Sequence, residues 1–254
     1  MRQSTFRHSL LTFCTLLLTT ATSRAADAPT LDSDPHLAAW YKFDESAGKS
    51  AADSSKNARN ASLQGALSFD TSSAPGRIGQ ALKFDGKDSV TIPDYKGITG
   101  PAPRTISAWI KHSSNGGEIV SWGFNDAGKM FVVCFIRDRI GVHPKGGYFY
   151  MKSATNDDKW HHIAIVVRQA SPPNLHDDVK LYLDSEIAEI DDIGLLDLWP
   201  IDTGDKQDVR IGARYKGLLD DLRIYSRPLL DQEITALFKL ESARPLPNPS
   251  PDKQ

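Results

Sequence analysis

Hydrophobic residues in this chain occur in short runs separated by turn residues, a pattern typical of an all-β protein. Most runs span four to eight residues and are rich in Val, Ile, Phe, Tyr and Trp, which favour strands. The expected strands are 38–43, 81–84, 89–93, 105–111, 118–123, 129–136, 148–152, 160–167, 179–184, 186–190, 208–213 and 218–225. The segments between them are rich in Gly, Pro, Asn and Asp and lack the helical pattern of about 10–15 residues that a parallel α/β fold needs. The sequence therefore predicts an antiparallel sandwich or barrel.

One helix is predicted, over residues 231–239. Ile234, Leu237 and Phe238 form an apolar stripe with helical spacing, and Asp231 is a suitable residue to cap its N-terminus. We therefore expect an all-β fold with one short helix near the C-terminus.

The first 25 residues have the features of a signal peptide. A basic start is followed by an apolar run of about ten residues and then by small residues up to Ala25. The run is shorter than the ~20 apolar residues of a membrane span, so no span is expected once the signal is removed. We therefore expect a signal peptide at 1–25, a linker at 26–36, a folded domain at 37–240 and a Pro-rich tail at 241–254. The protein is expected to be secreted, periplasmic or at the cell surface.

Charge and cysteine content narrow the function further. The formal net charge of the 254 residues is −2, and loss of residues 1–25 removes three arginines and no acid, which gives −5. A mildly acidic chain gives no electrostatic reason to expect nucleic acid or an anionic membrane as partner. Cys134 is then the single cysteine, so no internal disulfide is expected. It lies in the apolar run MFVVCFI and is interpreted as a buried core residue, with a reactive thiol as the alternative.

Several stretches, taken in order, match a known family. They are AWYKFDESAG (39–48), ADSSKNARNASL (52–63), GRIGQALKFDGKDSVTIP (76–93), TISAWIK (105–111), DKWHHIAIVV (158–167), VKLYLDSE (179–186) and IGARYKGLLDDLRIYSRPLLDQEI (211–234). Over residues 37–240 the chain resembles the laminin-G-like jelly-roll family of concanavalin A-like sandwiches. The resemblance implies two antiparallel sheets in a jelly roll, with the strand near Trp40 beside the strand near Ile224. One departure is Ser185, where the family usually has a Gly in the hairpin turn after the Asp.

Asp220 raises the question of a calcium site. In a regular strand it shares a face with Leu218, Leu222 and Ile224, and a carboxylate facing a core is costly unless it is paired. Backbone N–H groups of an adjoining loop, or an arginine, would satisfy it. Alternatively, Asp220 binds calcium together with Asp53, Asn60 and Asp44, because calcium takes carboxylate and amide oxygens and the implied fold brings the two terminal strands together.

Two constellations that would indicate an enzyme are incomplete. Jelly-roll glucanases use a Glu-x-Asp-x-x-Glu strand, but in the nearest match, which begins at Glu189, the position of the general acid holds Gly194. Without a second carboxyl group, retaining hydrolysis has no general acid. His161 and His162 are adjacent and point to opposite faces of a strand, so they do not form a zinc site together. The acidic residues 186–192 are interpreted as the solvated ends of a hairpin.

The remaining candidates are aromatic side chains suited to a sugar face. Trp199 lies in a long loop, and Tyr148 and Tyr150 lie in GGYFYMK. We therefore expect an exported, non-catalytic binding module whose partner is a glycan or an extracellular protein. A glycoside hydrolase of the jelly-roll glucanase type and a structural or assembly domain are the alternatives.

Overall fold

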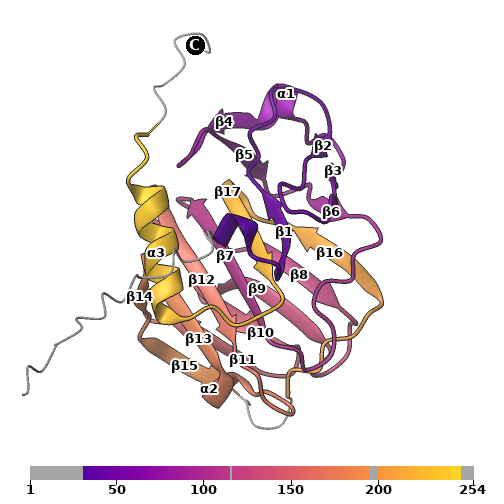
Figure 1. Ribbon diagram of the computed structural model, residues 1–254, viewed down its shortest axis with the longest axis vertical. Coiled ribbons are helices and arrows are strands. Elements are labelled where there is room, and N and C mark those ends of the chain that lie inside the picture. Colours follow the sequence, from indigo (N-terminus) through magenta and orange to yellow (C-terminus); the bar gives the residue numbers. More distant parts are fainter. Residues whose placement is uncertain (1–30, 115, 195–199, 247–254) are drawn as a thin grey trace, which may run out of the picture.

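The chain folds into two antiparallel β-sheets packed face to face, as the hydrophobic pattern predicted (Figure 1). The structure is a computed structural model and describes residues 31–114, 116–194 and 200–246. The predicted signal peptide, Trp199 and the last eight residues lie outside the described residues. No helix in the described part of the chain is long and apolar enough to cross a membrane.

The first sheet contains eight strands. In spatial order they are β14 (Glu186–Ile187), β13 (Val179–Leu183), β12 (His161–Val167), β7 (Arg104–Lys111), β17 (Lys216–Tyr225), β5 (Gln80–Asp85) and β4 (Ser73–Pro75), with β1 (Leu37–Tyr41) pairing with the later half of β17. All these pairs are antiparallel.

The second sheet contains nine strands. In spatial order they are β15 (Ile190–Gly194), β11 (Tyr148–Met151), β10 (Arg139–His143), β9 (Met130–Ile136), β8 (Glu118–Gly123), β16 (Gln207–Ile211), β6 (Val90–Ile92), β3 (Ala61–Leu63) and β2 (Ser50–Ala51). The short strands β2 and β3 lie within or at the end of segment 44–62, which was predicted to be a loop. Strand β15 corrects another prediction, because it pairs along β11 as the edge of this sheet and is not the end of a hairpin.

In the part of the chain that the structure describes, four helical segments accompany the sheets: the 3-10 turn η1 (Leu31–Ser33) and the helices α1 (Phe69–Ser72), α2 (Leu175–Asp178) and α3 (Asp231–Ser242). Only α3 is longer than one turn, and it lies across the outer face of the eight-stranded sheet (Figure 1). Its N-cap is Leu230, whose N–H donates to Glu233 Oε2 at 2.8 Å. The predicted cap, Asp231, instead accepts hydrogen bonds from Tyr182 at 2.7 Å and Lys180 at 3.0 Å.

The hydrophobic core fills the space between the sheets because alternate side chains of each strand point inward. Phe131, Val133, Ile163 and Ile165 are fully buried there. A second apolar cluster lies on the opposite, outer face of the eight-stranded sheet, under α3. Its members are Leu37, Trp40, Ala164, Val166, Tyr182, Tyr225, Leu229 and Ile234. The eight-stranded sheet is therefore buried on both faces around β12, β7 and β17.

The first and last strands are neighbours, as the family resemblance implied. Ala39 lies opposite Ile224 and Trp40 lies opposite Arg223. The hairpin turn at Ser185 also keeps the geometry of an Asp-Gly turn, with φ of 50° at Asp184 and 75° at Ser185. Positive φ at both central positions is what a type I′ turn requires.

A β-bulge in β17 corrects the predicted environment of Asp220. The pairing with β7 shifts by one residue between Asp220 and Arg223. Asp221 lies within this bulge and has a φ of 47°. A one-residue bulge reverses which side chains face the core. Leu219, Leu222 and Ile224 therefore face the sandwich core. Asp220 lies on the opposite face from Leu222 and Ile224.

The folded unit extends beyond both predicted boundaries, 37 and 240. Before residue 37, Asp34 is 5% exposed and pairs with Arg227, and Asp32 contacts Arg223. After residue 240, Glu241 is 1% exposed in the last turn of α3. Ionic contacts at these positions are not visible as hydrophobic periodicity, which is why the sequence pattern placed the limits too far inward.

Candidate ligand-binding face

The outer face of the nine-stranded sheet carries polar and aromatic side chains in two rows that cross the strands. Strand register places Ser62, Thr91, Arg210, Ser121, Val132 and His143 in the first row. The second row contains Glu118, Cys134, Gly141, Tyr150 and Asp192. Side chains directly opposite each other on neighbouring strands share a face. The side chains between them along each strand, such as Phe149, belong to the core.

Two of the predicted aromatic residues lie together on this face. Tyr148 and Tyr150 stack with ring centroids 6.0 Å apart and an angle of 27° between the rings. The Tyr148 hydroxyl donates to Asp192 Oδ2 at 3.4 Å, and the Tyr150 hydroxyl accepts a hydrogen bond from Arg137 at 3.1 Å. Tyr148 is half-buried, whereas Tyr150 is 1% exposed, so the prediction that both are surface residues is wrong for Tyr150. Tyr148 is therefore the ring of the pair that a ligand can reach.

Glycines set the position of both tyrosines. Gly194 lies opposite Tyr148 in β15, and a Cβ atom at Gly194 would be 2.4 Å from Tyr148 Cζ. Gly141 lies opposite Tyr150, and a Cβ atom there would be 2.7 Å from Tyr150 Cβ. The Tyr148 ring consequently lies close over the backbone of the edge strand.

A cavity of about 320 Å³ opens beside Tyr148. It is lined by Ile136, His143, Gly146, Gly147, Tyr148 and Gly194. Burial lowers the pKa of His143, so its ring is neutral at neutral pH. Its Nδ1 accepts the N–H of Lys145 at 3.2 Å, which leaves the proton of the neutral ring on Nε2. An aromatic wall, an apolar floor and a histidine donor are the groups that hold a sugar ring by its C–H face and its hydroxyls.

The carboxylates of this face are paired with arginines. Glu118 contacts Arg210 at 3.2 Å and Arg214 at 2.8 Å, and it accepts a hydrogen bond from Ser121 at 2.6 Å. Burial alone would raise the pKa of Glu118, but the Ser121 hydroxyl and the two arginines outweigh it and hold the pKa below the usual range. Asp192 lies 3.3 Å from Arg137. The lowered pKa keeps Glu118 ionised, whereas a general acid for glycoside hydrolysis needs a raised pKa.

Cys134 lies in the floor of this face and is 6% exposed. Burial raises the pKa of its thiol to about 12, with a further contribution from the Glu118 charge. A thiol in this environment stays protonated and is a poor nucleophile.

The four predicted calcium ligands fall into two separate arrangements. Asp220 Oδ2 accepts the N–H of Ile78 at 2.8 Å, and Asp44 Oδ1 accepts the N–H of Gln80 at 2.7 Å, so both hold the loop before β5. Asp53 accepts hydrogen bonds from Trp40 at 2.9 Å and from residues of its own loop, while Asn60 Oδ1 accepts the Asp53 N–H at 3.1 Å. Across 31–114, 116–194 and 200–246, no three or more His, Cys, Asp or Glu side chains are grouped so as to hold a metal ion.

Asp220 nevertheless keeps one oxygen without a hydrogen bond to a described residue. This atom, Oδ1, is buried, and the side chain as a whole is 0% exposed. Burial, and secondarily the charge of Asp221, raise the pKa of Asp220 to about 8. The orphaned oxygen is the one observation in its surroundings that fits a cation, and calcium there stays a prediction.

The two adjacent histidines lie on opposite faces of β12, as expected, and have different surroundings. His161 lies between Asp184 at 2.8 Å and Asp157 at 3.1 Å. His162 is fully buried under α3 and shares a hydrogen bond of 2.8 Å with the Ser107 hydroxyl. Within the ranges that the structure describes, neither histidine belongs to a group of three or more side chains that could hold a metal ion.

Most of the face was not recognised from the sequence. Glu118 and Arg210 come from separate segments, and only strand register shows that they share a face with Tyr150. Arg137 joins them through its hydrogen bond to Tyr150. In the sequence, a strand is recognised by the alternation of apolar and polar residues. Strands β10 and β15 are too short and too polar to show this alternation clearly.

Comparison with known proteins agrees with this architecture. Residues 84–235 match the model of the concanavalin A-like lectin/glucanases superfamily. No sequence among the curated proteins matches the chain.

Three solved structures have folds similar to that of this chain. Domain 4 of AbnA, a GH43 extracellular arabinanase from Geobacillus stearothermophilus, in complex with arabinotriose, superposes with a TM-score of 0.57 at 19% identity, covering 79% of this chain and 97% of that domain. The binding domain of Paraclostridial Mosquitocidal Protein 1 gives 0.51 at 16% identity, covering 78% of this chain and 52% of that one. The receptor-binding domain of botulinum neurotoxin D gives 0.50 at 14% identity, covering 81% and 53%. The chain thus spans about half the length of the two toxin domains, and at these identities the likeness concerns the fold alone.

Proposed function

Because the chain belongs to the concanavalin A-like lectin/glucanases superfamily, we propose that it is an exported, non-catalytic module that binds a saccharide beside Tyr148. The observation that carries the proposal is the half-buried Tyr148 ring, stacked on Tyr150, as one wall of a 320 Å³ cavity. A fold alone does not determine function, so the site has to support the proposal.

The chemistry of the face suits a neutral sugar. The Tyr148 ring offers an apolar surface for sugar C–H groups, and His143, which lines the same cavity, offers a hydrogen-bond donor. Arg137 and Asp192 lie next to the tyrosines and are already paired with each other, so they form polar surroundings without a strong net charge. The arabinanase domain with the similar fold was solved with arabinotriose, which makes this trisaccharide a suitable first probe.

Binding without catalysis is supported by the state of the carboxyl groups. The pKa is raised for the carboxyl groups of Asp220 and Asp221, and both are buried in the other sheet. Glu118 and Asp192 on the outer face of the nine-stranded sheet are paired with arginines, and the pKa of Glu118 is lowered. Export is supported by the basic start, apolar run and small residues of 1–25.

A glycan array that includes arabinotriose tests the proposal, followed by calorimetry with the oligosaccharides that bind. Tyr148→Ala should weaken binding about tenfold or more, equivalent to about 1.4 kcal/mol. The control is Ile187→Ala, which removes an exposed apolar side chain from the opposite sheet and should leave affinity unchanged.

Two outcomes would overturn the proposal. Release of shorter sugars from a bound oligosaccharide, followed by chromatography, would establish the hydrolase alternative. The absence of binding to every glycan on the array, with or without calcium, would favour a protein partner or an assembly role.

A further inference from the structure

We propose that the outer face of the eight-stranded sheet carries a second ligand site, in which Lys83 and Lys111 bind an oxyanion of an acidic saccharide. Lys83 lies in β5 and Lys111 in β7, and each is directly opposite Leu218 in the intervening strand β17. Directly opposite residues share a face, so both lysines project on either side of one leucine. Their strands are about 10 Å apart, twice the usual spacing. The flexible four-carbon stems of lysine span such a distance and place both ammonium groups on one anion.

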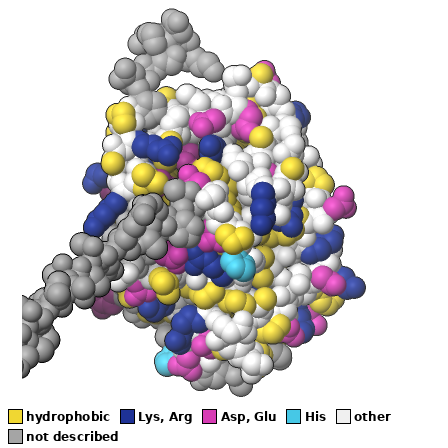
Figure 2. All heavy atoms as spheres, in the orientation of Figure 1, with side chains coloured by type: hydrophobic (Ala, Val, Ile, Leu, Met, Phe, Trp, Pro, Cys, Tyr) yellow, Lys and Arg dark blue, Asp and Glu magenta, His cyan; other side chains and the backbone are white. Residues whose placement is uncertain are grey.

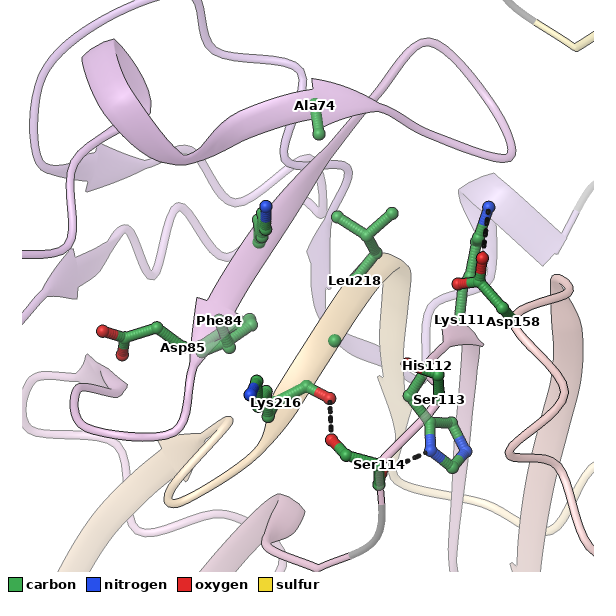
Figure 3. A pocket seen from close by; sticks show the side chains of 12 residues that line it. Ala74, Phe84, Asp85, Lys111, His112, Ser113, Ser114, Asp158, Lys216 and Leu218 are labelled. Carbon is green, nitrogen blue, oxygen red and sulfur yellow. Dashed lines mark hydrogen bonds and ion pairs between the residues drawn. The ribbon is translucent and has the colours of Figure 1, made fainter.

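Lys83 and Lys111 are among the residues that line a cavity of about 390 Å³. Figure 3 shows this cavity with Lys111 labelled. Leu218, Phe84 and Gly217 supply apolar and backbone surface, and Ser113 and Ser114 supply hydroxyl groups. A Cβ atom at Gly217 would be 2.6 Å from the Lys111 carbonyl oxygen, so a glycine is needed where the strands approach. The volume lies within the usual range of ligand pockets, about 300–1,000 Å³.

Positive charge at this site is only partly neutralised. In the described part of the chain, neither Lys83 nor Lys216, which also lines the cavity, forms an ion pair with a carboxylate. Lys111 reaches Asp158 at 3.9 Å, a long contact between partly exposed groups (Figure 3). The remaining acid, Asp85, lies 3.7 Å from Lys87 and points away from Leu218 in Figure 3.

His112 adds no charge to the cavity. Burial lowers its pKa, so the ring is neutral. Its two nitrogens are occupied by the Ser114 carbonyl and the Thr155 hydroxyl, each at 2.8 Å. The lysines therefore determine the charge that a ligand meets, while the rest of this side of the molecule shows basic and acidic side chains interspersed (Figure 2).

A saccharide fits better than a free anion because the site continues beyond the lysines. A second cavity of about 310 Å³ shares Lys83 and Asp85 with the first and adds Thr71, Ser72 and Asp88. The Asp88 carboxylate accepts the N–H of Ala66 at 3.0 Å. Two adjoining hollows with hydroxyl groups and an apolar floor match several linked sugar units, with one acidic group between Lys83 and Lys111. This site is on the opposite sheet from Tyr148, so it does not depend on the proposed function.

Calorimetry with the full chain tests the proposal with three oligosaccharides of equal length: one carrying uronic acids, one sulfated and one neutral. An acidic oligosaccharide should bind, with affinity that falls as salt rises, and the uronate and sulfate arms identify which oxyanion is preferred. The Lys83→Gln/Lys111→Gln double variant should lower its affinity at least tenfold. The matched control is Lys87→Gln, a lysine with 82% side-chain exposure on the neighbouring turn, which should change affinity less than twofold. Unchanged melting temperatures confirm that the variants are folded.

Three results would overturn the proposal: no binding of either acidic oligosaccharide, equal binding of the neutral one, or an equal loss in Lys87→Gln and the double variant. Tyr148→Ala should leave binding of the acidic oligosaccharide unchanged, which separates this site from the cavity on the other sheet.

Discussion

Glu241 in the last turn of α3 forms an ion pair with Arg223 in β17, and both are almost completely buried, with 1% and 2% exposure. The same Glu241 carboxylate accepts a hydrogen bond from the Trp109 indole at 2.5 Å. Arg223 also contacts Asp221 and Asp32, each at 3.2 Å. The C-terminal helix is therefore fastened to the sheet by a buried polar cluster in addition to its apolar stripe.

Replacing Glu241 with Ala should lower the free energy of unfolding by about 3 kcal/mol, because it leaves Arg223 buried with fewer counter-charges. Urea unfolding followed by circular dichroism measures this change. Glu241→Gln should cost less, since the amide oxygen still accepts from Trp109. Lys239→Ala, at an exposed position of the same helix, is the control, and an equal loss in both variants would contradict the role of the cluster.

His162 should make the protein less stable in acid. Burial, and then the charge of Arg223, lower its pKa to about 3, whereas an unfolded histidine titrates near 6.5. Between these values the unfolded chain binds a proton that the folded chain does not, so its contribution to stability is complete above pH 6.5 and falls as the pH falls toward 3. The loss is about 1.4 kcal/mol per pH unit in this interval. The free energy of unfolding, measured by urea denaturation at several pH values between 7 and 4, should depend less on pH in His162→Gln than in the unsubstituted protein.

His161→Gln provides the comparison for this measurement. The hydrogen bond to Asp184 raises the pKa of His161, so its stabilising contribution is present below the ordinary pKa and is lost as pH rises. The two variants should therefore alter the pH dependence in opposite directions. The same direction of change in both would be inconsistent with the assigned environments.

Gly194→Ala should reduce saccharide binding by moving the Tyr148 ring. The added Cβ atom displaces the Tyr148 ring, which lies within 2.4 Å of its position. We expect an affinity loss comparable to that of Tyr148→Ala, about tenfold, measured by calorimetry. Combining the two substitutions should cost little more than either alone, whereas additive losses would mean that Gly194 acts independently of the ring.

Binding of calcium at Asp220 and Asp44 can be tested by measuring the melting temperature of the protein. A bound divalent cation would use the orphaned Asp220 Oδ1, so calcium should raise the melting temperature and EDTA should lower it. Asp220→Ala should abolish the difference. A melting temperature that is the same in calcium and EDTA excludes the ion as a stabiliser.

Much of the fold could be predicted because its information is local. Alternation of apolar and polar residues predicted the main strands, and the matching stretches implied that β1 lies beside β17. The bulge at Asp221 could not be predicted in this way, since one extra residue leaves the composition of the strand unchanged. Two consecutive aspartates were the only hint, because Asp tolerates positive φ better than most residues.

The candidate site was predicted less well because it depends on contacts between strands far apart in sequence. Tyr148 and Tyr150 were predicted as surface aromatic residues, and the structure stacks their two rings on each other. That Tyr150 is covered and Tyr148 is not depends on neighbours such as Arg137, which no local pattern relates to either tyrosine. The lysines around Leu218 were equally invisible, because each belongs to a different strand.

The position of η1 and α3 has a practical consequence for anyone who studies this molecule. Leu31 packs into the apolar cluster under α3, so both ends of the described fold lie on the side away from Tyr148. A fluorescent protein or a surface anchor joined at either end would hold the molecule with its tyrosine side turned outward. Immobilised in that way, the protein can be screened against large polymers without the support obstructing them.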